Sequence, residues 1–451
     1  MSKIKIGLSV ALLFLMMQGY AQQKADSVFH LSLQQTIQYA LANQPNVKNA
    51  KYEVGKASAK VKEITGIGLP QITGSINVLD YTQLPTTLIP AQFFGGPTGE
   101  FVPLQFGTQY NATGEIDASQ IIFDGSFIVG LEGAKAYRQL STQNLTLADI
   151  QAVAAITKAY YLVLVNNWKL QMTEADANRL KKLMDETQKM YEAGFSQKVD
   201  YERIQVNYNN EKTLETTITR MLTLSYKSLK FQMGMPIKDS ITLTDSLQTI
   251  PMNPDVGADT SFRPQNRIEY SIAQTNVWGS HLQLRKDRYA YLPTLSLTAT
   301  INRVNEGETT DFFNGSQPWY PMTVIGLKMN IPIFDGLQKN YRIQQDKYTV
   351  LENELQLNTL QESISLQIAN SMTNLQNALA DLQNQKENMQ LAQNVEHDTK
   401  IQYEAGTGSN LEVVDAETAL TEAETNYYNA LYNALTAQVD YKQANGTLFK
   451  K

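Results

Sequence analysis

The chain contains no cysteine among its 451 residues. This absence excludes structural disulfides, a thiol nucleophile and a cysteine-based zinc site, and it removes the residue that a bacterial lipoprotein needs for acylation. Its three histidines, His30, His281 and His397, are scattered, so neither a metal site nor a catalytic cluster is indicated. No phosphate-binding glycine loop and no Ser-His-Asp arrangement is recognisable. We therefore expect no enzyme, including no cell-envelope hydrolase, and no cofactor.

Long apolar runs are missing after the N-terminal segment. Residues 1–21 have the layout of a signal peptide, because Lys3 and Lys5 precede an apolar run that ends in small residues at Ala21, where we expect cleavage. No later stretch approaches the ~20 apolar residues of a transmembrane helix. If this exported chain crosses a membrane, it must do so with β-strands. Its net charge of −6 gives no general attraction to nucleic acid.

Glycine and proline are absent from two long stretches, residues 134–193 and 337–405. Continuous helices of this length would reach roughly 90 to 105 Å, which implies a rod or a tube. Each stretch ends at the sequence YEAG, where Gly194 or Gly406 can take the left-handed conformation of a helix C-cap. A second stretch free of both residues follows at once, so each YEAG marks the tip of a helical hairpin.

The helical stretches combine an apolar seam with many polar positions. Asparagine, glutamine, serine and threonine are frequent on them, which fits either a solvated outer face or the lining of a water-filled interior. Periodicity alone does not choose between the two. The seam in the second stretch follows the coiled-coil spacing of 4, 3, 4, 3 residues, at Ile368, Met372, Leu375, Leu379 and Leu382.

The YEAG sequences also reveal an internal repeat. Tyr191 and Tyr403 are 212 residues apart, as are Gly194 and Gly406, and an IFDG sequence occurs twice at nearly the same offset. Such self-similarity indicates two tandem structural repeats. We predict a signal peptide at 1–21, a first repeat at 22–235, a linker at 236–261 and a second repeat at 262–451.

Each repeat carries two segments of about ten residues in which apolar and small polar residues alternate. Alternation of this kind is typical of transmembrane barrel strands, although a strand of a soluble sandwich would share it. The strands of each pair are joined by long loops, which belong on the outer face of such barrels. Their phenylalanines could fold across the mouth or pack against neighbouring loops: Phe93, Phe94, Phe312 and Phe313. The predicted strands span about 71–84, 106–122, 294–305 and 320–333.

Four strands cannot close a barrel, since even small outer membrane barrels use about 8. Bare strand edges are not viable in lipid, so several chains must share one barrel. Three copies would supply twelve strands, with four from each chain, and the same symmetry would assemble their helices into a hollow cylinder. The sequence therefore predicts an α+β membrane protein that functions as a homotrimer.

The order of these features resembles the TolC-type outer membrane efflux proteins. A helix, a strand, a loop, a strand, FDG, a long helix, YEAG and a second helix occur twice behind the signal peptide, over nearly all of the mature chain. The resemblance implies a trimeric channel-tunnel, with a shared 12-stranded barrel in the outer membrane and an α-helical coiled-coil barrel in the periplasm. It also implies a periplasmic adaptor (membrane fusion) protein and an inner-membrane RND or ABC-type transporter as partners.

In the family resembled, rings of acidic residues narrow the periplasmic mouth just after the second-repeat turn. Glu412 and Asp415 fall at these positions, three residues apart on one helix face. Three chains would bring at least six carboxylates together, and such a ring would filter by charge and bind divalent cations in the closed state. The alternative is two ordinary surface acids beside a turn.

The resemblance also implies links that hold the tip closed. Tyr403 matches the linking tyrosine and Asp200 an acidic partner in the first repeat. The well-known example carries an arginine where this chain has Gly408, so the gate would depend on Tyr403 with Asp200 or on Arg203. The hairpin tips would dock the adaptor through Tyr191, Gly194, Tyr403 and Gly406.

A second interpretation remains from the residues alone. A soluble periplasmic coiled-coil scaffold or adaptor would share the signal peptide and the hairpins. It would have no use for four strands that alternate as lipid-facing strands do. The leading expectation is passive conduction through the trimer, of a substrate and for a pump class that the sequence does not identify.

Overall fold

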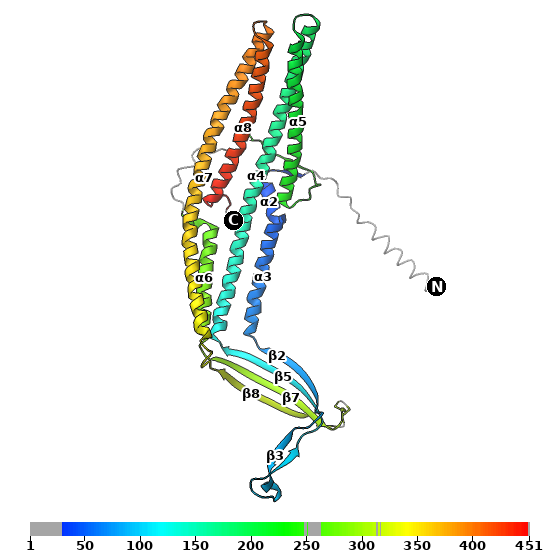
Figure 1. The fold of residues 1–451 in the computed structure, drawn as a ribbon, viewed down its shortest axis with the longest axis vertical. Helices are drawn as coiled ribbons and strands as arrows, with labels where there is room; N and C mark the ends of the chain where they lie inside the picture. The colour runs from blue at the N-terminus through cyan, green and yellow to red at the C-terminus, as the bar shows by residue number, and fades with distance from the viewer. Residues whose placement is uncertain (1–28, 248–249, 251–262, 313, 316, 450–451) are drawn as a thin grey trace, which may run out of the picture. The chain divides into compact units, whose positions relative to one another are not determined.

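The computed structural model describes residues 29–247, 250, 263–312, 314–315 and 317–449. The predicted signal peptide and residues 251–261 of the predicted linker lie outside this part of the chain. The chain forms two compact units, and each combines segments of both sequence repeats (Figure 1). Unit 1 comprises Met1–Lys51, Asn144–Tyr270 and Leu360–Lys451; unit 2 comprises Tyr52–Gln143 and Ser271–Thr359.

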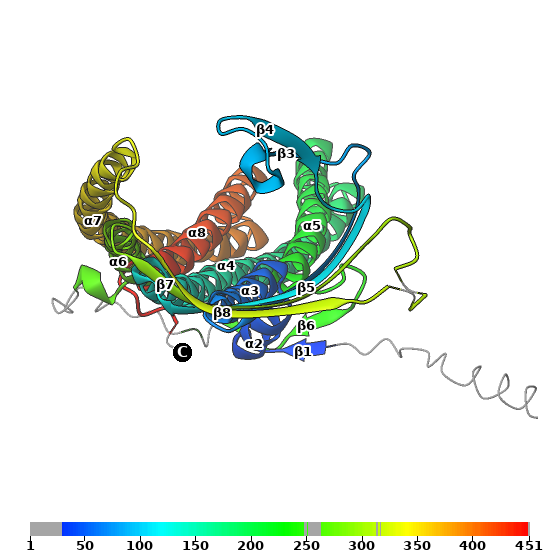
Figure 2. The ribbon, with the colours of Figure 1, turned by 90° about the horizontal axis from the view of Figure 1, so that it is seen from below.

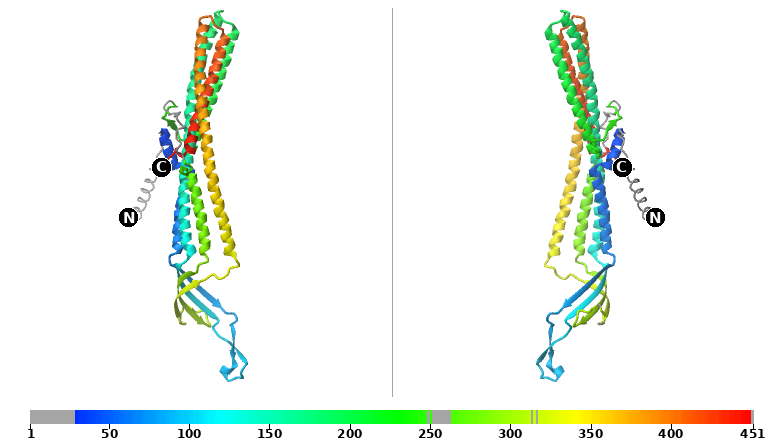
Figure 3. Two further views of the ribbon diagram at one scale, coloured as in Figure 1. Left: turned by 90° about the vertical axis from the view of Figure 1, so that its left-hand side faces the viewer. Right: turned by 90° about the vertical axis from the view of Figure 1, so that its right-hand side faces the viewer.

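Unit 1 is built from two helical hairpins and a small parallel β-pair (Figures 1 and 3). Each hairpin joins the C-terminal part of a very long helix to a shorter helix that runs back beside it. The β-pair holds the start of the described chain against the segment that follows the first hairpin. Its elements are β1 (Phe29–Leu31), α2 (Leu33–Asn43), α4 (Gly125–Glu192), α5 (Lys198–Met233), β6 (Ile241–Leu243), α7 (Gln338–Glu404) and α8 (Asn410–Ala444).

The core of unit 1 contains an apolar stretch of helix α4 that was not predicted from the sequence as a possible membrane span. Helix α4 includes an 18-residue window with mean hydropathy 1.3 and few charges, which by length and composition could cross a membrane. That window is 61% buried inside the protein. Ile156, Tyr160 and Val163 are fully enclosed there and pack with residues such as Leu229 and Leu435. Burial in a protein core therefore accounts for this apolarity.

The predicted coiled-coil seam of α7 is the less exposed face of that helix. Leu375 is buried and Ile368, Met372, Leu379 and Leu382 are partly buried, whereas most residues between them are exposed. The spacing of 4 and 3 residues thus identified the face that packs.

Unit 2 contains a four-stranded antiparallel sheet with the order β2-β5-β7-β8, together with helices at one end of the strands (Figure 1). The start of α4 and the start of α7 belong to this unit. The four strands overlap the four ranges predicted from alternation. The elements are α3 (Pro45–Ile67), β2 (Gln71–Asp80), β3 (Thr86–Pro90), β4 (Phe101–Gln105), β5 (Tyr110–Phe123), α6 (Ile268–Tyr289), β7 (Thr294–Gly307) and β8 (Tyr320–Asn330).

The FDG sequences join strand to helix in each repeat. Oδ1 of Asp124 accepts hydrogen bonds from the backbone N–H groups of Ser126 and Phe127, which caps the start of α4. Oδ2 of Asp335 accepts from the backbone N–H of Lys339 in the first turn of α7. Gly336 has φ of 68°, a left-handed conformation that suits glycine.

The two outer strands of the sheet have no partner along their free edges. Among the residues described, β2 pairs only with β5, and β8 pairs only with β7. All residues of β2 are exposed, including Ile76 at 76%, and nearly all of β8 is exposed, including Ile325 at 74%. Such apolar, unpaired edges are unstable in isolation.

The two long loops behave differently. The first forms a separate antiparallel hairpin, β3 with β4, and a short 3-10 helix η2 (Ala91–Phe94) lies at its end. Phe93 and Phe94 are exposed. In the second loop Phe312 is buried, so it packs within its own chain. Phe313 lies outside the described residues.

Candidate functional site

Both YEAG sequences form the same helix-ending turn in unit 1. The backbone N–H of Phe195 donates to the carbonyl of Met190 at 2.8 Å, and that of Thr407 donates to the carbonyl of Gln402 at 2.9 Å. The glycine of each turn has a positive φ, of 82° at Gly194 and 74° at Gly406. This is the Schellman arrangement, in which a left-handed glycine satisfies the last carbonyls of a helix.

The tips expose aromatic and apolar side chains. Phe195 is 86% exposed, and Tyr191 and Met190 are about two-fifths exposed at the first-repeat turn. Of the docking residues that the resemblance implies, Tyr191, Gly194 and Gly406 are exposed in the single chain, whereas Tyr403 is partly buried.

Two of the predicted gate acids cap helices within their own chain. The backbone N–H of Ser409 donates to Oε2 of Glu412 at 2.9 Å, and the N–H of Glu412 donates to Oγ of Ser409 at 3.3 Å. Oδ2 of Asp200 accepts from the backbone N–H of Gln197 at 3.1 Å. These are capping boxes that start α8 and α5. Asp415 is exposed beyond the cap.

The predicted linking tyrosine, Tyr403, packs against a small apolar cluster, here called the tip cluster. It consists of Leu183, Ile204 and Val413, with Tyr403 packed against it. The tip cluster therefore joins both hairpins. Within the part of the chain described, the structure records no hydrogen bond between Tyr403 and Asp200.

Gly408 and Arg203 complete the predicted set. Arg203 is exposed on α5. A Cβ atom at Gly408 would lie 3.1 Å from both Cβ of Gln402 and the backbone nitrogen of Tyr403. The N–H of Gly408 donates to the carbonyl of Gln402 at 3.0 Å, which folds the turn back on the helix end. A larger side chain here would require the end of α7 and this turn to shift by a few tenths of an ångström, which favours glycine at the position.

Deeper in unit 1, a buried group of charged residues, here called the ionic cluster, connects all four helices. Nη2 of Arg179 is 2.8 Å from Oε2 of Glu417, and its Nε donates to Oε1 of the same carboxylate at 3.1 Å. The guanidinium also lies 3.1 Å from Asp176 and 3.8 Å from Glu396. Its members are Asp176 and Arg179 on α4, Glu211 on α5, Glu396 on α7, and Glu417 and Glu424 on α8; the five carboxyl groups are buried, whereas the side chain of Arg179 is 27% exposed.

The ionic cluster contains five carboxyl groups and one guanidinium, so its charges would not cancel if every group were ionised. Burial raises the pKa of Glu417 to about 7, although Arg179 opposes the shift. Burial and the nearby charge of Asp176 raise the pKa of Glu211 to about 7 and that of Glu424 to about 8. The carboxylates outweigh the burial of Arg179 and raise its pKa. Near neutral pH Glu211, Glu417 and Glu424 are therefore partly protonated.

A small cavity lies beside the ionic cluster. Its volume is about 20 Å³, enough for one water molecule. Asp176, Glu211 and Glu424 line it together with Lys169, whose pKa burial lowers. Oε1 of Glu211 is buried and has no hydrogen-bond partner in the protein. Among the residues described, no group of three or more acidic or histidine side chains is arranged to hold a metal ion.

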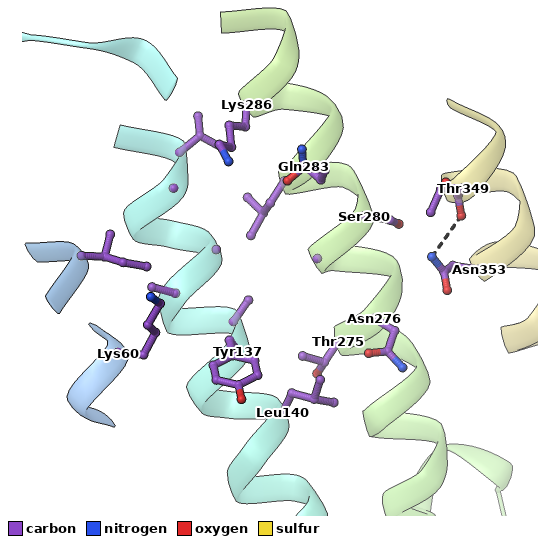
Figure 4. A pocket seen from close by; sticks show the side chains of 18 of the residues that line it. Lys60, Tyr137, Leu140, Thr275, Asn276, Ser280, Gln283, Lys286, Thr349 and Asn353 are labelled. Carbon is purple, nitrogen blue, oxygen red and sulfur yellow. Dashed lines mark hydrogen bonds between the residues drawn. The ribbon is translucent and has the colours of Figure 1, made fainter. Parts of the chain in front are cut away.

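Unit 2 has a larger groove of about 1170 Å³ between α3, α4, α6 and α7. Figure 4 shows Tyr137, Leu140 and Thr275 beside this space, with Lys60 and Lys286 near its rim. Glycines make the hollow: a Cβ atom at Gly133 or Gly279 would meet nothing within 4 Å. The groove is an open, mostly apolar surface with basic residues at its edge.

Comparison with known proteins gives one consistent result. The sequence profile of the family described as "Outer membrane efflux protein" matches residues 36–235 and 273–447. "Outer membrane protein TolC" of Escherichia coli (strain K12) is 25% identical over 354 residues, which cover 76% of this chain and 71% of the relative. "Probable efflux pump outer membrane protein TtgC" of Pseudomonas putida is 22% identical and covers 94% of this chain and 85% of its own.

Solved structures share the fold. The chain of CusC superposes with a TM-score of 0.73 at 16% identity and covers 95% of both chains. The outer membrane protein VceC from Vibrio cholerae gives a TM-score of 0.70 at 16% identity, covering 92% of this chain and 96% of its own.

Proposed function

Because this chain belongs to the outer membrane efflux protein family, and is thus an outer membrane channel protein, we propose that three copies close one 12-stranded barrel and continue it as a periplasmic helical tunnel. The predicted α+β, TolC-like fold is confirmed. The alternative of a scaffold or adaptor without a channel receives no support, since the relatives named above are outer membrane proteins.

The single observation that supports the trimer is the pair of free edges in unit 2. Strands β2 and β8 each lack a partner on one side, and both expose apolar side chains along their length. In lipid an open edge leaves backbone N–H and C=O groups unsatisfied, at several kcal/mol for each group. Pairing β8 of one copy with β2 of the next removes every edge and gives twelve strands for three copies.

Transport through this pore is passive, without catalysis, and energy comes from a partner. A periplasmic adaptor docks on the hairpin tips around Tyr191, Gly194, Tyr403 and Gly406, and an inner-membrane RND or ABC-type transporter delivers the substrate. Exposed aromatic side chains at the first tip support a docking role.

At the periplasmic mouth, Glu412 and Asp415 of three copies form a ring that favours cations. Both are exposed in the single chain, so both are available to face a shared axis. Tyr403, Asp200 and Arg203 hold the closed state through contacts between the coils of the two repeats. Glu412 and Asp200 can accept such contacts while they cap their helices, because a carboxylate has about four acceptor sites.

Purification tests the assembly directly. We expect the protein to require detergent, to migrate as a trimer that heating converts to monomers, and to conduct ions in planar bilayers. A boiled sample is the matched control for both measurements. A monodisperse monomer obtained without detergent would refute the shared barrel, and a trimer without conductance would refute the open path through it.

A further inference from the structure

The β3–β4 hairpin is apolar, and in the described part of the chain its two strands pair only with each other. Between Tyr81 and Gln109 the only charged residue is Glu100. The hairpin pairs Leu88 with Pro103 and Ile89 with Val102, so apolar residues occur on both faces. Its most exposed large side chains are Leu88, Phe93, Phe94, Phe101 and Phe106.

A two-stranded hairpin of this length is marginally stable when nothing covers it. Large exposed apolar patches mark interaction sites. The second external loop provides an internal comparison, because Phe312 is buried there and its carbonyl accepts a hydrogen bond from Nε1 of Trp319 at 3.2 Å. In that loop Phe312 is covered by its own chain, whereas Phe93 and Phe94 of the β3–β4 hairpin are exposed.

The direction of the hairpin indicates what covers it. Figure 2 shows the four-stranded sheet of unit 2 as an arc, with β3 and β4 turned over its concave side. When a sheet closes into a barrel, its concave side faces the axis. The hairpin therefore leaves the lipid-facing side and extends over the lumen, where the symmetry of a trimer brings the same segment of two other copies.

We propose that the β3–β4 hairpins of three copies pack against one another through Phe93 and Phe94 and narrow the outer mouth of the channel. This inference depends on the proposed trimer. The partner is a second copy of the same chain, because the hairpin has almost no charge to recognise an ionic ligand and lies over the concave side of its sheet, where the same hairpins of the other copies would be.

Cysteine cross-linking tests the contact, since the natural chain has no cysteine to give background. Phe94→Cys in the detergent-purified trimer should form a disulfide-linked dimer on mild oxidation. The matched control is Asn314→Cys, which is exposed on the second external loop and should remain monomeric after denaturation. Equal linkage at both positions would show random loop encounters and overturn the packing.

A second measurement tests the constriction. Phe93→Ser with Phe94→Ser should raise single-channel conductance at least about twofold, whereas Asn314→Ser should leave it unchanged. A heat-sensitive trimer without the Phe94→Cys linkage would refute the hairpin contact and leave the shared barrel standing. Absence of any trimer would refute both, and linkage with unchanged conductance would refute the narrowing.

Discussion

Removal of Arg179 should loosen the contact between the two hairpins, and the resulting loss of stability should depend on pH. Its guanidinium forms two hydrogen bonds with Glu417, a side chain only 3% exposed, and lies within ion-pair distance of Asp176 and Glu396. In Arg179→Met these carboxylates lose the one cation of the ionic cluster. Breaking a buried ion pair from one side typically costs about 3 to 5 kcal/mol.

The size of the stability loss in Arg179→Met depends on the protonation of Glu417. At pH 8.5, above the pKa of about 7 of Glu417, the carboxylates are charged and we expect the full loss of about 3 to 5 kcal/mol. At pH 5.5 the glutamate is protonated, so what remains is mainly an unmade hydrogen bond at about 1 to 2 kcal/mol. For unit 1, the loss of about 3 to 5 kcal/mol at pH 8.5 corresponds to a fall of about 10 °C in the thermal midpoint.

The assay is thermal unfolding of the detergent-purified protein followed by far-ultraviolet circular dichroism at both pH values. Arg220→Met is the matched control, because Arg220 is exposed on α5. Arg179→Met with Glu417→Gln should recover part of the loss at pH 8.5. Equal destabilisation at pH 5.5 and 8.5 would contradict the assignment of a charge imbalance.

The remaining predictions concern pH and the gate. In the unaltered protein, the helices should lose thermal stability between pH 5 and 9, because the folded pKa values of Glu211, Glu417 and Glu424 lie above the unfolded one. The contribution of these three residues is complete below about pH 4.5 and disappears through pH 7 to 8. A flat profile of thermal midpoint against pH by circular dichroism would contradict this. Tyr403→Phe with Asp200→Ala should raise single-channel conductance about twofold, and Asp200→Asn, which keeps the helix cap, is the control for lost capping. Glu412→Gln with Asp415→Asn should reduce cation over anion selectivity in bilayers, and unchanged reversal potentials would remove both residues from the ring.

Local features were predictable from the sequence where one residue type determines the backbone. Gly194 and Gly406 end long runs without glycine or proline, and both adopt the left-handed conformation expected of a C-cap. Alternation located the four strands, because side chains on a strand point to opposite faces. The β3–β4 hairpin was predicted only as a loop, since prolines at positions 90 and 103 break the usual strand pattern.

The ionic cluster was missed although its spacing was present. Val413, Glu417, Leu420 and Glu424 follow one another at 4, 3 and 4 residues, so two glutamates occupy the apolar seam of α8. All four are buried. A search restricted to apolar residues interrupts the seam at each acid and assigns the acids to the surface. For such helices, the apolar seam should be extended through acidic positions, and the basic residue that pairs with these acids should then be sought on the neighbouring helices.

The two hairpins are thus joined in two chemically different ways. The tip cluster is apolar and should hold at any pH, whereas the ionic cluster depends on protons that Glu417 and Glu424 release near pH 7 to 8. Well-packed apolar residues in place of a buried ion pair are often neutral or stabilising, so stability alone gives no reason for charges at this level. A charged layer does supply a contact whose strength changes with protonation or with the approach of another charge. For the gate that we propose, which opens when the hairpins part, a contact that can be weakened without unfolding the helices would serve this motion.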